Sequence, residues 1–456
     1  MSSADVVVLG MGPGGEDVAT TLAKAGLDVV GVEKELLGGE CPYWACVPTK
    51  MMVRATDSLA EAGRVNELAG HSTVASSWDP VARRIREDAT GNWNDQIAVD
   101  RFKSCGGRFV RGAGRLDGPA RVVVDDQPIE ASKAIVVATG TRPRLPAIDG
   151  LDGVDYWTNR GAVAATEVPE SLVVVGGGAV GCEFAQVFAR FGSRVTLLEG
   201  GAHVLPTEEN EACKLLHEIF AADGIDVRAE SAAVACASNA DGVAVTLTNG
   251  STVSGERMLV ATGRRADLAA VATSTIGVDE EEAWIPVDDH LRVKGAPGVW
   301  AIGDVVGGGF THMAVHHARI AADDILGKPG PGTSDRAKPR VTFTDPEVGA
   351  VGLTEREARE QGIDVRTAIA QVPASARGWI HKAGNEGFIK VVEDGRRGVL
   401  VGATSMGPVG GEVLSMLTLA VHAEVPTDDL RHMVYAYPTF HRAVEDALRD
   451  LAEASS

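Results

Sequence analysis

The sequence is poor in cysteine, in aromatic residues and in positive charge. Six cysteines occur in 456 residues, and aromatic residues make up only 5%, so the cores must be built from aliphatic side chains. Acidic residues outnumber basic ones by 63 to 43, which gives a net charge of −20. Such a field repels nucleic-acid phosphates and anionic lipid. No apolar run reaches the length of a membrane span. We therefore expect no nucleic-acid partner and no membrane.

The N-terminal residues "MSSADVVVLGMGPGG" lack a basic leader and a cleavable apolar segment. We accordingly expect a cytoplasmic, reducing location, where a disulfide is more often catalytic than structural. The length exceeds what one hydrophobic core holds, which predicts two to four domains. Glycine is abundant at 54 residues, which indicates several glycine-dependent turns.

A nucleotide-binding pattern opens the chain. A short buried strand over residues 6–9 runs into G-x-G-x-x-G, and a helix over 16–26 and a second strand ending on Glu33 follow. The glycines permit a tight turn and a close approach to a pyrophosphate, the helix N-terminus attracts that anion, and the carboxylate binds a ribose diol. With strand, helix and acid in register, the motif is strong evidence for a dinucleotide site. Its glycines are Gly10, Gly12 and Gly15.

The pattern recurs in "SLVVVGGGAVGCEFAQVFARFGSRVTLLEG", which ends on Glu199. From the first glycine to the acid the separation is 23 residues in both copies, from 10 to 33 and from 176 to 199. We therefore predict two dinucleotide sites. Because Glu199 would repel a 2′-phosphate, NADH is preferred to NADPH. The glycines of the second copy are Gly176, Gly178 and Gly181.

The remaining segments suggest a domain order. Two Ala-Thr-Gly turns, one with Thr139 and Gly140 and one with Gly263, mark the crossovers out of the first domain and back. A later buried strand ends near Asp304, where a carboxylate would meet a second ligand group. A linker over 327–340 precedes a segment without nucleotide signals. The predicted domains are residues 1–145 and 269–335 for the first nucleotide, 146–268 for the second, and 336–456 as a C-terminal domain.

The segment "GGECPYWACVPTK" holds Cys41 and Cys46 just after the first nucleotide pattern. Zinc is unfavoured because the other cysteines are scattered and no His pair lies at ligand spacing, so we expect no metal site. An ideal helix would place the two Cα atoms about 7.5 Å apart, beyond usual disulfide reach. A distorted first turn at Pro42 would close that gap. A reactive dithiol at a helix N-terminus is the leading explanation.

Taken together, these motifs resemble the pyridine nucleotide–disulfide oxidoreductases, the dimeric flavoprotein family of dihydrolipoamide dehydrogenase, glutathione reductase and mercuric reductase. The resemblance rests on both glycine motifs, Cys-x4-Cys-x-Pro-Thr-Lys, both Ala-Thr-Gly turns, "AIGDV" and "FTDPEVGAVGLTEREA", and it covers almost the whole chain. It implies an α/β fold with two Rossmann-like domains, for FAD and NAD, and a C-terminal α+β dimerisation domain.

The resemblance also implies residue roles. The first site would bind FAD, with Asp304 as a further contact, and the second would bind the nicotinamide nucleotide. Cys41 would be the thiol that meets substrate and Cys46 the thiol at the flavin. Lys50 and Glu183 match a family ion pair beside the flavin; without the family they would be an ordinary surface pair. Electrons would pass from NADH to FAD, to the Cys41–Cys46 disulfide and on to a small-molecule, disulfide-type substrate, as in dihydrolipoamide dehydrogenase.

The chain departs from the family near its C-terminus. The disulfide-reducing members carry His-Pro-Thr-x-x-Glu, whose His acts from the partner subunit, whereas Tyr437 and Arg442 stand at the His and Glu positions here. A free phenol, with a pKa of about 10, is a poor base at neutral pH. One reading makes His441 the base, with Glu445 one turn on; the alternative is a solvated helix-face pair.

Other readings keep the fold but change the acceptor. A quinone, a dye or a second nicotinamide needs no base, and tyrosine at the His position is similar to soluble transhydrogenases, whose cysteine pair is incomplete. Mercuric reductase also has tyrosine there, but uses a C-terminal cysteine pair that this chain lacks. A flavin-binding sensor without turnover is the rival class. Tyr43 and Trp44 are bulky where the family has small residues, and either narrow the approach to Cys41, stack on a flat substrate, or simply pack.

Overall fold

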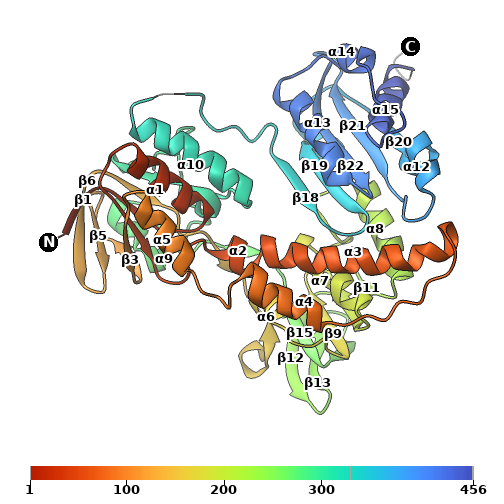
Figure 1. The fold of residues 1–456 in the computed structure, drawn as a ribbon, viewed down its shortest axis with the longest axis horizontal. Helices are drawn as coiled ribbons and strands as arrows, with labels where there is room; N and C mark the ends of the chain where they lie inside the picture. The colour runs from red at the N-terminus through yellow and green to blue at the C-terminus, as the bar shows by residue number, and fades with distance from the viewer. Residues whose placement is uncertain (1, 329, 454–456) are drawn as a thin grey trace. The chain divides into compact units, whose positions relative to one another are not determined.

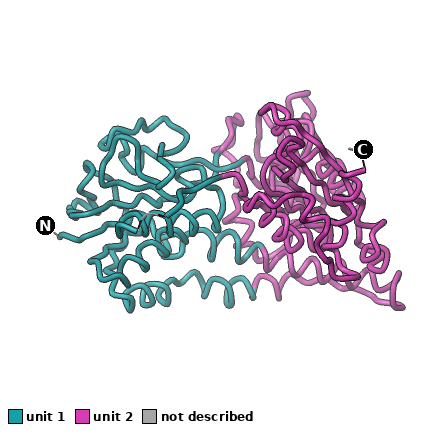
Figure 2. Tube along the Cα trace, turned by 90° about the horizontal axis from the view of Figure 1, so that it is seen from above, with its two compact units in different colours: residues 1–49, 83–144, 263–334 teal, residues 50–82, 145–262, 335–456 magenta. Residues whose placement is uncertain are grey.

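The computed structural model describes residues 2–328 and 330–453, and its chain forms two compact units (Figures 1 and 2). Unit 1 comprises residues 1–49, 83–144 and 263–334, and unit 2 comprises residues 50–82, 145–262 and 335–456. The units are defined by packing, and the domain boundaries expected from the sequence stay a prediction.

Unit 1 is built on a seven-stranded sheet in the order β3-β2-β1-β6-β5-β4, with β17 also paired to β6. The centre of this sheet is parallel, because β1 pairs in parallel with β2 and β6, and β17 pairs in parallel with β6. The strands are β1 (Ser2–Leu9), β2 (Val29–Glu33), β3 (Arg108–Arg111), β4 (Gly114–Leu116), β5 (Arg121–Val124), β6 (Gln127–Val137) and β17 (Val299–Ala301).

The apolar run in β1 is explained by hydrophobic packing on both faces of this sheet. Val7 and Leu9 pack in one core cluster, while Val6 and Val8 pack in another, as the alternation of a strand requires. Helices α1 and α10 lie side by side in Figure 1 and contact each other. The helices within unit 1 are α1 (Pro13–Lys24), α2 (Glu40–Trp44), α5 (Gln96–Ser104), α9 (Leu268–Val271) and α10 (Thr311–Ile325), and β7 (Arg142–Pro143) pairs with β16 (Arg264–Arg265).

Unit 2 holds a second parallel sheet in the order β11-β10-β9-β15-β8 and a three-stranded antiparallel sheet, β12-β13-β14. Its elements are β8 (Tyr156–Trp157), α6 (Asn159–Val163), β9 (Ser171–Val175), α7 (Ala179–Arg190), β10 (Arg194–Leu198), α8 (Asn210–Ala222), β11 (Asp226–Arg228), β12 (Ala233–Asn239), β13 (Gly242–Leu247), β14 (Thr252–Gly255) and β15 (Arg257–Val260). The predicted α/β fold class is confirmed.

The C-terminal part of unit 2 is a five-stranded antiparallel sheet, β18-β19-β22-β21-β20. Helix α13 packs on β19 and β22, and α15 packs on β20 and β21, around one apolar cluster. The elements are β18 (Pro339–Thr342), β19 (Glu347–Gly352), α11 (Glu355–Glu360), β20 (Val365–Gln371), α12 (Ala376–His381), β21 (Phe388–Asp394), β22 (Val399–Gly407), α13 (Gly410–His422), α14 (Thr427–His432) and α15 (Arg442–Glu453).

Two helices belong to the stretches where the chain passes between the units: α3 (Cys46–Leu68) and α4 (Asp79–Arg84). The sequence predicts a helix over residues 48–62, but α3 begins two residues earlier and ends later. Pro48 fits because it lies in the first turn, where a missing N–H breaks no helical hydrogen bond.

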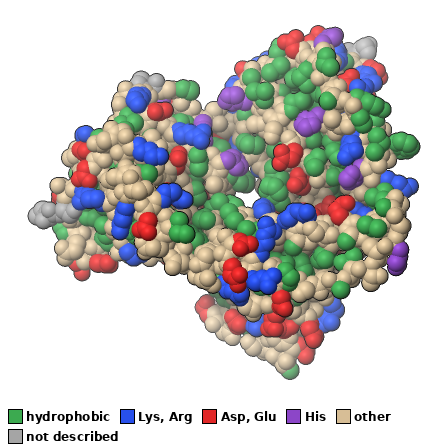
Figure 3. Space-filling view, in the orientation of Figure 1, with side chains coloured by type: hydrophobic (Ala, Val, Ile, Leu, Met, Phe, Trp, Pro, Cys, Tyr) green, Lys and Arg blue, Asp and Glu red, His purple; other side chains and the backbone are tan. Residues whose placement is uncertain are grey.

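The surface mixes charges of both signs. In Figure 3, acidic and basic side chains lie next to one another on the face shown. Exposed pairs such as Arg108 with Asp28, at 2.7 Å, are typical of this pattern. No helix among the described residues is both long and apolar enough to cross a membrane.

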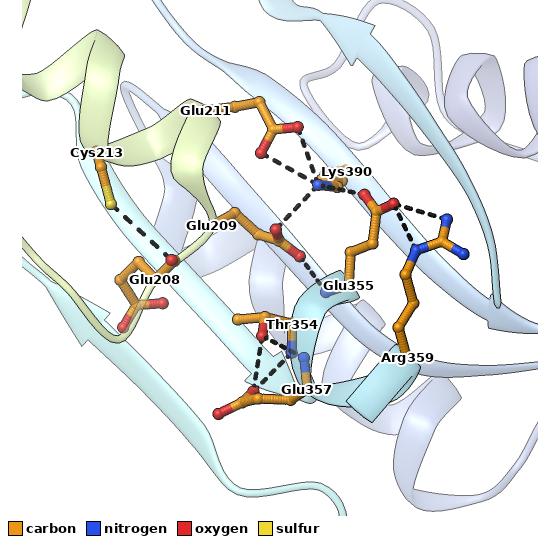
Figure 4. A network of polar contacts seen from close by, with 9 residues as sticks. All are labelled: Glu208, Glu209, Glu211, Cys213, Thr354, Glu355, Glu357, Arg359 and Lys390. Atoms are coloured by element: carbon orange, nitrogen blue, oxygen red, sulfur yellow. Dashed lines mark hydrogen bonds and ion pairs between the residues drawn. The ribbon is translucent and has the colours of Figure 1, made fainter. Parts of the chain in front are cut away.

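A buried lysine joins two parts of unit 2 (Figure 4). Lys390, on β21, is 2% exposed, and its Nζ lies 2.9 Å from Glu209, 3.0 Å from Glu211 and 3.0 Å from Glu355. Burial alone would lower the pKa of Lys390, but its carboxylate partners raise it above the ordinary value. Lys390 therefore stays protonated inside the protein, and its positive charge is balanced by the neighbouring carboxylates.

We expect Lys390→Met to lower the free energy of unfolding by about 3 kcal/mol, because it leaves the buried carboxylate of Glu209 without its cation. Thermal unfolding should show a midpoint lower by several degrees. Arg359→Ala is the control, since Arg359 contacts Glu355 from an exposed position. An unchanged midpoint in Lys390→Met would contradict this role.

Asp57, on α3, gives a pH-dependent prediction. Burial, followed by repulsion from Asp345, raises the pKa of Asp57 to about 6. The folded state thus holds this proton more tightly than the unfolded state. The protonated Asp57 carboxyl therefore makes its full contribution to folding stability below about pH 4, and this contribution is lost as the pH rises through 6. Asp57→Asn should raise the thermal midpoint at pH 7.5 and change it little at pH 4. The exposed control Asp152→Asn should shift neither value.

Candidate active site

The first glycine turn in unit 1 has the shape that a pyrophosphate needs. Gly10 has φ +94°, and a Cβ on Gly15 would lie 2.0 Å from the carbonyl oxygen of Gly10. Gly12 caps α1 with extended backbone, and a Cβ there would meet no atom within 4 Å. Two glycines are thus required by the turn itself, while Gly12 leaves an open face at the helix N-terminus.

The second turn, in unit 2, repeats these features. Gly176 has φ +110°, and a Cβ on Gly181 would lie 1.9 Å from the oxygen of Gly176. Gly178 caps α7 and, like the middle glycine of the first turn, is open on its Cβ side. The two turns therefore have the same local geometry.

Each acidic residue is fixed by two backbone donors. Glu33 accepts hydrogen bonds from Met11 N and from Glu35 N, both at 2.8 Å. Glu199 accepts from Gly177 N at 2.8 Å and from Gly201 N at 2.7 Å. Each carboxylate is held at the glycine turn, where its remaining lone pairs suit ribose hydroxyls.

Asp304 is tied to the first Ala-Thr-Gly turn. It follows β17 in a short 3₁₀ helix and accepts a hydrogen bond of 3.1 Å from Thr141 Oγ1. Arg264 donates to the same hydroxyl at 2.8 Å and to the carbonyl of Thr141 at 2.7 Å. Thr141 and Arg264 are not among the predicted site residues, although each directly follows an Ala-Thr-Gly turn. The turn glycines, Gly140 and Gly263, have φ +66° and +101°, and Thr139 precedes the first of them.

The helix is interrupted between the two cysteines. Cys41 lies in α2 and Cys46 begins α3, and the intervening Ala45 has φ −136° and ψ −108°. The predicted distortion is confirmed, but it occurs at Ala45. Pro42 lies inside the first turn of α2, where a missing N–H breaks no helical hydrogen bond.

The break brings the two thiols into contact. A hydrogen bond with Cys46, followed by burial, raises the pKa of the Cys41 thiol, and a hydrogen bond with Thr311 opposes the rise. Thr311 Oγ1 is 3.3 Å from Cys46 Sγ. Thr311 opens α10, a helix of 15 residues whose N-terminus favours nearby negative charge. Sequence reasoning missed this threonine, whose only signal is its place shortly after Asp304.

The other cysteines are not part of this pair. Cys182, Cys213 and Cys236 are buried, and Cys105 is half-buried. Cys182 donates to the carbonyl of Gly177 at 3.3 Å, as expected of a small buried residue. Within the described ranges, no group of three His, Cys, Asp or Glu side chains is arranged to hold a metal ion.

Lys50 and Glu183 form a partly buried ion pair in unit 2. Glu183 is 8% exposed and accepts a hydrogen bond of 2.9 Å from Phe343 N, and the Lys50 ammonium lies 4.6 Å from the Phe343 ring centroid. Lys50 follows Cys46 by one turn of α3. The pair is therefore held more firmly than an ordinary surface pair.

Tyr437 and His441 lie near the start of α15. Tyr437 is 68% exposed, and the Arg442 guanidinium lies 5.3 Å from its ring centroid. Arg442 also lies 3.3 Å from Glu445, the residue expected to accompany His441. Glu445 is thus engaged by Arg442, the residue that stands at the family's Glu position.

Comparison with known proteins supports these features. The family model described as pyridine nucleotide-disulphide oxidoreductase matches residues 4–322, and that of its dimerisation domain matches residues 338–448. A dihydrolipoyl dehydrogenase of Chlorobaculum tepidum is 34% identical over 99% of this chain and 97% of the relative. A mercuric reductase of Streptomyces lividans is 31% identical over 97% of this chain and 94% of the relative.

A solved structure shows the same fold. The HOCl-induced flavoprotein disulfide reductase RclA from Escherichia coli has a TM-score of 0.86 at 26% identity, over 98% of this chain and 99% of that one. FAD and a pyridine nucleotide are the cofactors that these relationships support. With two glycine turns, two anchored carboxylates and a contacting thiol pair, the chain belongs to the pyridine nucleotide-disulphide oxidoreductase family of FAD-dependent enzymes.

Proposed function

We propose that the protein uses NADH to reduce a disulfide substrate through the Cys41–Cys46 pair. The observation that carries the proposal is the contact between these two thiols at the start of α10. The same unit contains the first glycine turn, Glu33 and Asp304. The thiol pair and the first glycine turn thus belong to one folded unit, as the proposed electron transfer from flavin to sulfur requires.

The residues of unit 1 fit FAD. The open face of Gly12 at the start of α1 accommodates a pyrophosphate, Glu33 has lone pairs for a ribose, and Asp304 and Thr141 offer polar atoms. Bound FAD would supply the hydride-accepting chemistry that links a reduced nicotinamide to the thiol pair. In unit 2, Gly178 and Glu199 have the matching roles for the nicotinamide nucleotide, and the Glu199 carboxylate favours NADH over NADPH.

Each remaining side chain has a proposed role. Cys41 exchanges with the substrate, and Cys46, hydrogen-bonded to Thr311, forms the internal disulfide. The raised pKa of Cys41 keeps the resting thiol protonated, so a proton must leave as the sulfur attacks. Lys50, which follows Cys46 by one turn of α3, pairs with Glu183 and supplies a fixed positive charge.

The helices and connections that accompany the C-terminal sheet form the proposed dimer interface. Trp379, Val434 and Tyr437 are 76%, 93% and 68% exposed, which is unusual for large apolar side chains and indicates a covered surface. In a homodimer, Tyr437 from one subunit would donate a hydrogen bond to a thiolate of the other, in the position where relatives use histidine. His441 is the alternative proton acceptor.

Anaerobic titration with NADH tests the proposal. The wild-type protein should take up two electron pairs per flavin and develop a long-wavelength band from a thiolate beside the flavin. NADH should be at least about tenfold more efficient than NADPH, because a 2′-phosphate would face Glu199. Bleaching of the flavin after one electron pair would overturn the dithiol role. A panel of lipoamide, small disulfides, quinones and mercuric ion, repeated on Tyr437→His, identifies the acceptor class.

A further inference from the structure

Two tryptophans stack on each other, and one of them lies between the two cysteines in the sequence. Trp44, the last residue of α2, and Trp93 have ring centroids 5.2 Å apart and planes inclined by 24°. Both side chains are half-buried, so the stack reaches the surface of unit 1. Trp44 follows Cys41 by three residues in α2, and residues at that spacing share a helix face. The aromatic pair therefore lies on the same side of α2 as Cys41.

Trp93 is held in an unfavourable backbone conformation. A π-helix over Ile85–Ala89 leads into three successive residues with positive φ: Gly91 at +53°, Asn92 at +60° and Trp93 at +54°. The left-handed region costs a bulky residue free energy, and such strain is concentrated at functional sites. The indole Nε1 of Trp93 is buried and has no hydrogen-bond acceptor among the described residues. A purely structural tryptophan usually has one.

A buried carboxylate fixes this strained segment to the start of α2. Asp95 is 9% exposed and accepts a hydrogen bond of 2.6 Å from Leu37 N, and it also pairs with Arg111. Leu37 immediately precedes the Gly38–Gly39 turn that leads into α2. Asp95 thus holds the chain around Trp93 against the chain that carries Cys41 and Trp44.

From this arrangement we propose that Trp44 and Trp93 form a binding surface for a flat aromatic ring, and that the preferred substrates are disulfides with aromatic substituents. This inference rests on the proposed disulfide reductase activity. A ring that packs on the indoles would place its attached sulfur near Cys41. The tryptophans would be substrate-binding residues that set specificity, while sulfur chemistry stays with the cysteines.

The reaction balances without a further reactant. The Cys41 sulfur attacks one sulfur of the aryl disulfide, the substrate S–S bond breaks, and the first aryl thiol leaves with a proton. Cys46 then attacks the mixed disulfide on Cys41 and releases the second aryl thiol. The dithiol loses two electrons and two protons, and the substrate gains both. NADH restores the dithiol through the proposed relay.

Steady-state kinetics compare 4,4′-dithiodipyridine, an aryl disulfide, with lipoamide, an aliphatic one, and both are uncharged. In Trp44→Leu, kcat/KM for the aryl substrate should fall about five- to tenfold, the worth of a lost aromatic stack, while that for lipoamide changes less than about twofold. Trp44→Phe keeps a ring and should retain most of the aryl activity. Ile97→Ala, an exposed apolar truncation on α5, controls for the loss of apolar surface. Equal losses for both substrates would overturn the inference.

A binding measurement without turnover decides the same question. In Cys41→Ser, 4,4′-bipyridine should quench tryptophan fluorescence saturably, and adding Trp93→Leu should weaken that binding about fivefold. Identical titration curves with and without Trp93 would overturn the inference. If the wild type reduced no disulfide yet still bound bipyridine through Trp93, the proposed function would fail while the aromatic surface stood.

Discussion

Gly12→Ala should give a folded but colourless protein. A Cβ at Gly12 meets no protein atom within 4 Å, so the substitution has no steric cost within the chain itself. If FAD pyrophosphate occupies that space, the methyl group should weaken flavin binding about a hundredfold. This factor corresponds to the upper end of the free-energy cost of overpacking. Flavin absorbance after gel filtration, with far-UV circular dichroism on the same fractions, measures both properties.

Gly178→Ala is the matched variant in the second turn, because its Cβ also meets no atom within 4 Å. We expect it to stay yellow and to raise the KM for NADH by a similar factor, since only the nicotinamide nucleotide should be obstructed. Gly63→Ala, in α3 and equally open, should change neither property. A yellow, active Gly12→Ala would refute the assignment of FAD to the first turn. A colourless Gly178→Ala would show that FAD binds at the second turn instead.

Cys41→Ser and Cys46→Ser should each lower disulfide turnover by at least about a thousandfold, because serine cannot form the internal disulfide or attack sulfur at neutral pH. Each variant should take up one electron pair per flavin in the NADH titration. Quinone reduction should continue, since it does not require the dithiol. Stopped-flow measurement of flavin reduction and steady-state assays with a small disulfide separate the two steps.

Cys105→Ser is the control, since this half-buried cysteine in unit 1 is not part of the thiol pair. It should keep full activity and take up two electron pairs. Disulfide turnover that survived in Cys41→Ser would remove the pair from the mechanism. A parallel loss of quinone reduction would show instead that every acceptor receives its electrons through the thiols.

Local features were predicted well because their physical cause is local. Gly15 and Gly181 are required by turns that a few neighbouring residues define. Glu33 ends the next strand in the first copy, and Glu199 directly follows it in the second. The irregular helix between the cysteines was also predicted, although the break occurs at Ala45. The helix predicted over residues 48–62 begins at Cys46 in the structure, two residues earlier.

Contacts between distant segments could not be predicted in this way. Thr311 meets Cys46 because α10 packs against α1, although the two residues are 265 positions apart in the chain. Asp95 reaches Leu37, and Trp93 reaches Trp44, from a part of the chain without a recognisable motif. Glycine, acid and cysteine spacing alone determined that this protein has two dinucleotide turns and a dithiol, because those patterns act over one or two elements. Only the tertiary structure decided what surrounds the thiols, because packing between elements selects those neighbours.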